Sequence, residues 1–290
     1  MGFICTGDWH ITATPPKKRL DDYLKAQKDK ISQILSMAKD LNCAVLQPGD
    51  FFDRPNEPHG IIADYWELFT HYNVDIITLY GQHDMRYHSK NTRDTALNII
   101  SKHKNVHLLI DGENYVPGTD MIIQTCDWES PINDQEAQPD IVMLHKLISN
   151  KELPFDDYTT VGDLVNQGPD TTKLYLCGDN HSSFIQEHDE RLVVNCGSIM
   201  RSNTGQSVHK PFVLYFPDMT DLLIYEKYEL KITPFSEVFD IADKDKTDAR
   251  TEHIASFIKS IAGEHELTGM DFIENLKQYT NTNTIDKNIR

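Results

Sequence analysis

The chain has 290 residues, of which 39% are hydrophobic and 25% are charged. This composition is that of a folded globular protein, and it excludes a disordered chain. The 28 Lys+Arg against 45 Asp+Glu give a formal net charge of −17, so the chain should repel a polyanion at long range. A nucleic-acid role therefore needs a further source of positive charge.

Short apolar runs alternate with amphipathic stretches in the first half of the chain, which is typical of layered β and α elements. We expect strands at 2–6, 43–47, 76–79 and 106–110, and helices at 19–39, 60–71 and 92–102. Apolar residues recur at helical spacing in the first of these helices. After about residue 120 strands dominate, at 121–125, 141–144, 173–177, 191–194, 212–216 and 222–230. The pattern predicts an α/β fold.

The C-terminal part of the chain differs from the rest. The polar stretch ADKDKTDAR at 242–250 breaks the apolar pattern, so we expect a main domain at 1–232, a linker at 233–250 and a helical segment at 251–290. Two apolar stripes follow at helical spacing, namely Ile254, Phe257, Ile258 and Ile261, and then Phe272, Ile273, Leu276 and Tyr279. These helices either cap the main domain or dock a partner protein.

The lack of a recognisable targeting signal and the cysteine pattern lead us to expect a cytoplasmic protein. The N-terminus lacks the basic and apolar regions of a signal peptide, and no apolar run is long enough to span a bilayer, so no membrane partner is expected. The five cysteines are an odd number without a CxxC pair. We expect them to be reduced structural thiols.

Polar residues with metal-binding side chains follow five of the predicted strands, where open α/β sheets place their ligands. They are Asp8 and His10; Asp50 and Asp53; Gln82, His83 and Asp84; His145; and Asp179 and His181. Residues two apart in an extended segment point the same way, so Asp8 with His10 forms one ligand pair and Asp179 with His181 another. Carboxylates and imidazoles suit divalent transition metals, and Asp50 between the pairs allows two ions. Such a site suits phosphoester hydrolysis.

The series D-x-H, G-D-x-x-D, G-x-H-D, a lone His after a strand and G-x-x-H resembles the calcineurin-like metallophosphoesterases over residues 4–232. The resemblance implies two packed, mainly mixed β-sheets flanked by helices, with a short C-terminal helical appendage. The segments VVNCGSIMRS at 193–202 and GQHDMRYHS at 81–89 are similar to the SbcD-type DNA repair nucleases, particularly phage versions.

This resemblance implies a role for each motif residue. The first metal would be held by Asp8, His10, Asp50 and His181, and the second by Asp50, Gln82, His145 and Asp179. His83 would protonate the leaving oxygen and be oriented by Asp53. Arg54 and His88 would contact the substrate.

Two residues depart from the family pattern, which has Asn in place of Gln82 and His in place of Asp179. Both changes leave the second metal with mostly oxygen donors, which favours Mn²⁺ or Mg²⁺ over Zn²⁺. We expect two divalent cations, with Mn²⁺ preferred.

The resemblance implies a metal-dependent DNA phosphodiesterase, an exo- or endonuclease subunit of DNA repair or recombination. Its implied partners are DNA and an SbcC-type coiled-coil ATPase, with a homodimer as a further expectation. A basic groove on the ATPase would hold DNA near so acidic a nuclease. Two alternatives stay open: a phosphoesterase acting on phosphoproteins or small nucleotides, and a metal-depleted scaffold. If the chain is phage-encoded, it is expected in the host cytoplasm.

Overall fold

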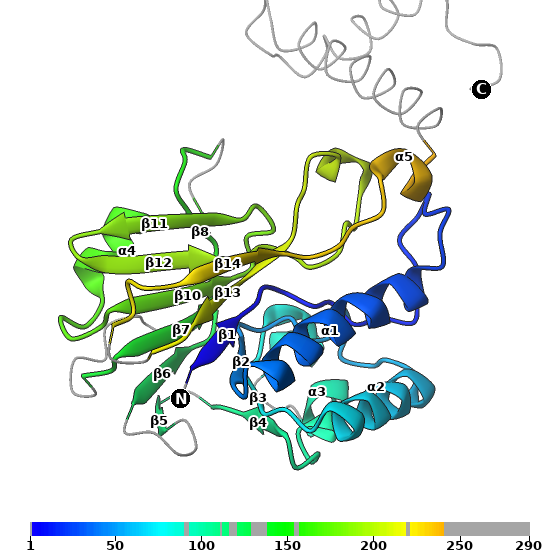
Figure 1. The fold of residues 1–290 in the computed structure, drawn as a ribbon, viewed down its shortest axis with the longest axis horizontal. Helices are drawn as coiled ribbons and strands as arrows, with labels where there is room; N and C mark the ends of the chain where they lie inside the picture. Colours follow the sequence, from blue (N-terminus) through cyan, green and yellow to red (C-terminus); the bar gives the residue numbers. More distant parts are fainter. Residues whose placement is uncertain are drawn as a thin grey trace, which may run out of the picture.

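The computed structural model describes residues 2–89, 93–110, 121–128, 138–153, 157–218 and 221–240, together with the backbone of 112–115 (Figure 1). The polar stretch at 242–250 and the helical segment predicted at 251–290 lie outside these residues. The described chain forms two six-stranded sheets with helices on their outer faces.

The first sheet carries the N-terminal strands. Its order is β14 (Glu226–Glu229), β13 (Phe212–Phe216), β1 (Phe3–Cys5), β2 (Ala44–Gln47), β3 (Ile76–Thr78) and β4 (Val106–Leu108). Strands β1 to β4 are parallel, whereas β13 runs antiparallel to both β1 and β14. The carboxyl ends of β1, β2 and β3 therefore meet at one edge of this sheet.

The second sheet has the order β11 (Phe184–His188), β12 (Arg191–Asn195), β10 (Leu174–Gly178), β7 (Ile141–His145), β6 (Ile122–Cys126) and β5 (Gly112–Tyr115). Its four central strands are parallel, and β5 and β11 are antiparallel edge strands. A small parallel pair, β8 (Ile148–Ser149) and β9 (Thr159–Thr160), lies beside it. Both main sheets are thus mixed, as expected.

Helices lie outside the two sheets. They are α1 (Tyr23–Asp40), α2 (His59–Tyr72), α3 (Ala96–Ile100), α4 (Val161–Gln167) and α5 (Phe235–Val238), with three 3₁₀ turns, η1 (Gln82–Asp84), η2 (Arg86–His88) and η3 (Thr204–Gln206). Helix α1 begins where the Asp22 side chain accepts a hydrogen bond from Lys25 N at 3.0 Å. The first helix therefore starts at Tyr23 and not at 19 as predicted, because this cap sets its first turn.

Successive side chains of a strand point to opposite faces of its sheet, and this alternation divides the core into three layers. In β1, Phe3 and Cys5 face the second sheet, whereas Ile4 faces α1 and α2. In β7, Met143 lies in the layer between the sheets, whereas Val142 packs outward in the layer that includes α4. Because every central strand is buried on both faces, the order of layers is helix, sheet, sheet, helix.

The structure confirms the expected fold, and all five cysteines are buried free thiols. The strand predicted at 222–230 is shorter, covering only Glu226–Glu229, and β11 and α4 were not predicted. The first residues of the predicted linker pack on the main domain, since Leu20 N donates to Val238 O at 2.9 Å. The boundary at 232 remains a prediction.

Candidate metal centre

The predicted ligands come together where the carboxyl ends of both sheets meet. Asp8 and His10 follow β1, Asp50 follows β2, and Gln82 begins η1 after β3. His145 ends β7 in the second sheet, and the segment with Asp179 and His181 follows β10. The parallel strands of each sheet deliver these side chains to one edge, so the site lies on the seam between the two sheets.

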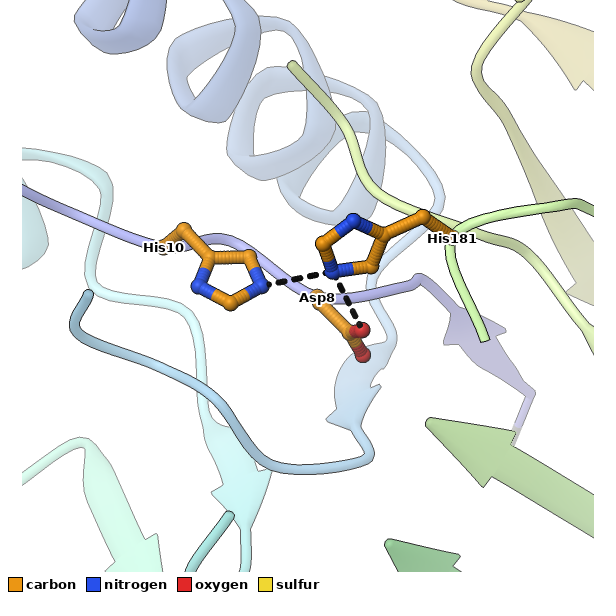
Figure 2. A group of neighbouring side chains, drawn as sticks. All are labelled: Asp8, His10 and His181. Carbon is orange, nitrogen blue, oxygen red and sulfur yellow. Dashed lines mark hydrogen bonds and ion pairs between the residues drawn. The ribbon is translucent and has the colours of Figure 1, made fainter. Parts of the chain in front are cut away.

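Three of the residues assigned to the first metal form a tight cluster, shown in Figure 2. His10 Nε2 lies 2.9 Å from His181 Nε2, which is 3.7 Å from Asp8 Oδ2. His10 Nε2 also lies 3.6 Å from Asp50 Oδ2, the proposed bridging carboxylate. Each residue of the cluster offers a ligand atom within 4.8 Å of the others, which is a suitable spacing for one cation.

The residues assigned to the second metal are joined in pairs. His145 Nε2 lies 3.3 Å from Asp50 Oδ2. Gln82 Nε2 donates to Asp179 Oδ1 at 2.6 Å, and Asp179 N donates to Asp8 Oδ2 at 3.1 Å. The two residues that depart from the family pattern therefore contact each other. Gln82 donates through its amide nitrogen, so its amide oxygen stays available as a ligand.

The donor set fits divalent cations. Asp8 Oδ1, Gln82 Oε1 and His145 Nε2 are buried and make no hydrogen bond within the described residues. Pro48 O accepts from His145 Nδ1 at 2.6 Å, and this contact leaves Nε2 as the nitrogen that faces Asp50. Buried polar atoms that make no hydrogen bond cost free energy unless a bound cation compensates them. We infer that the residues present are suited to hold metal ions.

Histidines in the centre have displaced pKa values. Although burial lowers the pKa of His145, the adjacent Asp50 raises it to about 10. Burial likewise lowers the pKa of His10, but the adjacent carboxylates of Asp53 and Asp50 raise it to about 9. Burial and the neighbouring His10 lower the pKa of His181 to about 4. Two imidazoles therefore bind protons at neutral pH in the positions where cations would supply the charge.

The carboxylates are displaced in opposite directions. Burial raises the pKa of Asp8 to about 7, with Asp50 adding to the shift and His145 opposing it. Burial also tends to raise the pKa of Asp50, but His145 and His10 hold it well below its usual range. Asp50 is thus the carboxylate that stays ionised, as a group shared by two cations must be.

Three of the proposed ligands have a strained backbone. His10, Asp50 and Asp179 have φ values of 45°, 48° and 75°, in the left-handed region that non-glycine residues avoid. Such residues cost roughly 1–3 kcal/mol each and persist where the surrounding structure over-determines them. In this conformation the three side chains point toward the candidate metal centre.

Two glycines allow the loops to approach closely. A Cβ on Gly81 would lie 2.1 Å from Asp50 Oδ1, and one on Gly178 would lie 2.5 Å from His145 Nδ1. Any larger residue would displace a proposed ligand.

His83 lies at the rim of the centre, with 45% of its side chain exposed. Its backbone N donates to Asp50 Oδ1 at 2.9 Å, and its Nδ1 lies 2.9 Å from Asp53 O. The Asp53 carboxylate is 3.9 Å from this ring but 3.5 Å from His10 Nδ1. The close contact between Asp53 and His83 therefore runs through the Asp53 backbone carbonyl. It leaves His83 Nε2 facing away from this anchor.

Of the two predicted substrate contacts, Arg54 lies at the periphery of the centre. The Arg54 side chain is 58% exposed, and its Nε lies 3.7 Å from Asp53 Oδ2. His88 ends η2, but its side chain lies outside the part of the chain that the structure describes.

Sequence reasoning assigned no role to Asp84, which is fully buried. Its carboxylate accepts hydrogen bonds from Phe51 N, Phe52 N and Gly81 N at 3.1, 2.8 and 3.0 Å. It thereby joins the loop after β2 to the loop after β3, and so fixes Asp50 relative to Gln82. The position of Asp84 in the motif G-Q-H-D was the sequence feature that could have indicated this role.

Two stacked mixed sheets with a carboxylate and imidazole cluster on their seam define a metal-dependent phosphoesterase. The calcineurin-like phosphoesterase family model matches residues 1–183, and the chain belongs to this family. The family is one of hydrolases that act on phosphoesters.

Solved structures are similar to the chain at low identity. A novel archaeal phosphodiesterase is 17% identical, with a TM-score of 0.44, and the match covers 79% of this chain and 100% of that one. TT1561 of Thermus thermophilus is 12% identical, with a TM-score of 0.49 and coverage of 79% and 99%. A putative 5'-nucleotidase from Staphylococcus aureus is 13% identical, with a TM-score of 0.47 and coverage of 82% and 54%. The comparison with curated proteins finds no match. Within the described residues, no helix has the length and apolar character needed to cross a bilayer.

Proposed function

We propose that the protein is a metal-dependent DNA phosphodiesterase, a nuclease subunit of the SbcD type. The observation that carries this proposal is the shared Asp50 carboxylate, which lies 3.6 Å from His10 Nε2 on one side and 3.3 Å from His145 Nε2 on the other. A carboxylate between two ligand sets is the arrangement that a two-metal phosphoesterase requires.

The chain's own residues divide into two ligand sets and one acid. Asp8, His10, Asp50 and His181 would hold the first cation, and Asp50, Gln82, His145 and Asp179 the second. When bound, the two cations supply a metal-activated nucleophile and charge stabilisation at phosphorus. The mostly oxygen donors of the second set favour Mn²⁺ or Mg²⁺.

His83 is proposed to protonate the leaving oxygen. Its exposed ring is anchored through Nδ1 on Asp53 O at 2.9 Å, so Nε2 is the nitrogen that can reach a substrate. A general acid needs this combination of a fixed ring and an accessible proton. Asp53 is then a positioning residue.

Two pockets beside the centre support an extended substrate. A pocket of about 590 Å³ includes His181, Lys210 and Lys227, and one of about 430 Å³ includes Gln82, Trp128 and Lys146. Lysine side chains bind phosphates, and an aromatic ring stacks on a nucleobase. A nucleic-acid strand bound across the centre could therefore make both kinds of contact. The net charge of −17 opposes DNA binding by the chain alone, which favours the proposed SbcC-type ATPase partner.

One experiment tests the proposal. The purified chain is incubated with linear duplex DNA, single-stranded DNA, bis-p-nitrophenyl phosphate and p-nitrophenyl phosphate, each with Mn²⁺, Mg²⁺ or EDTA. We expect Mn²⁺-dependent hydrolysis of the diester and, at a lower rate because the net charge of −17 opposes binding, of DNA. Hydrolysis of the monoester alone would instead indicate a phosphomonoesterase, and the absence of both hydrolysis and bound metal would indicate a metal-depleted scaffold.

A further inference from the structure

Away from the metal centre, a small cavity lies between α1, the segment after β12 and the segment that leads into α5. Its volume is about 20 Å³. Its wall contains three cationic residues, Arg19, Lys30 and Arg201, together with His209 and one acidic residue, Asp21. In a chain with a net charge of −17, such a gathering of positive charge is unexpected.

The one acidic side chain, Asp21, is already paired with Arg19. Arg19 Nε and Nη2 each donate to Asp21 at 2.7 Å, and Arg19 Nη1 donates to Arg201 O at 2.8 Å. The Arg19 guanidinium also lies over the rings of Tyr23 and Phe239, at 4.8 and 5.2 Å from their centroids. Arg19 and Asp21 thus neutralise each other and leave no acceptor for the other cations.

Arg201 has a free donor. The residue is only 8% exposed, and its Nη1 and Nη2 donate to Thr233 O at 2.9 Å and to His209 O at 3.2 Å. Its Nε is buried and makes no hydrogen bond within the described residues. A buried charged donor without an acceptor is costly, so this group points to a missing partner.

Lys30 adds a second unpaired cation. It makes no hydrogen bond or ion pair with the described part of the chain, and burial together with Arg19 and Arg201 lowers its pKa to about 8. Asp29 lies on the same helix, but it is paired with Lys25 at 2.5 Å. Lys30 and Arg201 therefore remain as two uncompensated charges beside one cavity.

We propose that Lys30 and Arg201 bind a small inorganic anion, of the size of chloride, in this cavity. A space of about 20 Å³ holds one water-sized particle. A six-carbon anion such as gluconate is far larger than this space. The anion would join α1 to the segment after β12, whose Arg201 contacts the segment that leads into α5, and it would thereby stabilise the end of the described chain against the main domain.

The test is thermal unfolding of the full chain in sodium chloride and in sodium gluconate at equal ionic strength. Binding to the folded state alone raises its stability by mass action, so we expect chloride to raise Tm by about 2–4 °C over gluconate. Lys30→Met should lose this difference. Lys28→Met, an equal change of charge at an exposed position of α1, should keep it.

Crystals soaked in sodium bromide provide an independent readout. We expect an anomalous peak in the cavity within contact distance of Arg201 Nε. Equal chloride effects in all three proteins, no chloride effect in the unmodified chain, or a cavity without bromide would each overturn the proposal. Because the readouts are stability and anion position, this outcome is independent of the proposed nuclease activity.

Discussion

The contact between Gln82 and Asp179 allows a sharp test of the second ligand set. Gln82 Nε2 donates to the carboxylate at 2.6 Å. Hydrogen bonds to charged groups contribute about 1.5–3 kcal/mol, and since both side chains are partly exposed we expect a value near the lower limit. Gln82→Asn shortens the side chain by one methylene, so the bond is lost. If about 1.4 kcal/mol of binding free energy is lost with it, the affinity for Mn²⁺ falls roughly tenfold.

The assay is calorimetric titration of Mn²⁺ into EDTA-stripped protein for Gln82→Asn, for Asp179→His and for the double variant. Each single change removes one partner and should weaken the second site. The double variant restores the Asn and His of the family pattern, so its affinity should lie well above the value that additivity gives. Gln33→Asn makes the same shortening on α1, away from the centre, and should leave Mn²⁺ affinity unchanged.

Effects that add to within about 0.5 kcal/mol would refute this reasoning, because independent sites behave in that way. They would mean that Gln82 and Asp179 do not act together on a metal ion.

Three further predictions concern the centre. Asp50→Asn should reduce bound metal from two ions to one or none in native mass spectrometry while the fold is kept; two bound ions with full activity would contradict the bridging role. His83→Asn should keep its metal but lower the hydrolysis rate by about 10²–10⁴-fold, whereas loss of metal would make His83 a ligand. In the EDTA-treated protein, His10 and His145 have pKa values raised to about 9 and 10, so their contribution to stability is complete below about pH 6.5 and lost as pH rises through 9 and 10. The Tm of this form should therefore fall between pH 7 and 10, and a Tm that does not fall would show that these imidazoles gain no protons on folding.

The central strands were predictable because both of their faces are buried. Runs such as Ile141–His145 are continuously apolar until a polar residue ends them, so both the strand and its polar end are visible in the sequence. The edge strand β11 was missed because Gln186, Glu187 and His188 are polar. Helix α4 was missed because seven residues are too short to establish a helical period.

Residues of the centre were predictable by position but their contacts were not. Strand ends identify Gln82 and Asp179 separately, yet nothing in the sequence indicates that two residues 97 positions apart share a hydrogen bond. The same holds for Asp53, whose backbone carbonyl contacts the His83 ring at 2.9 Å. A sequence pattern gives the identity of the side chains, but it does not predict which backbone group each side chain contacts.

The position of the centre on the seam between the sheets makes catalysis conditional on completed folding. Asp8, His10, Asp50 and Gln82 belong to loops of the first sheet, whereas His145, Asp179 and His181 belong to the second. Neither sheet alone possesses a full ligand set, so a chain whose halves have not docked in register cannot assemble the reactive centre. Cation binding in turn favours the docked state by mass action. If these residues are the ligands, a metallophosphoesterase built in this way is inactive until its tertiary structure is complete.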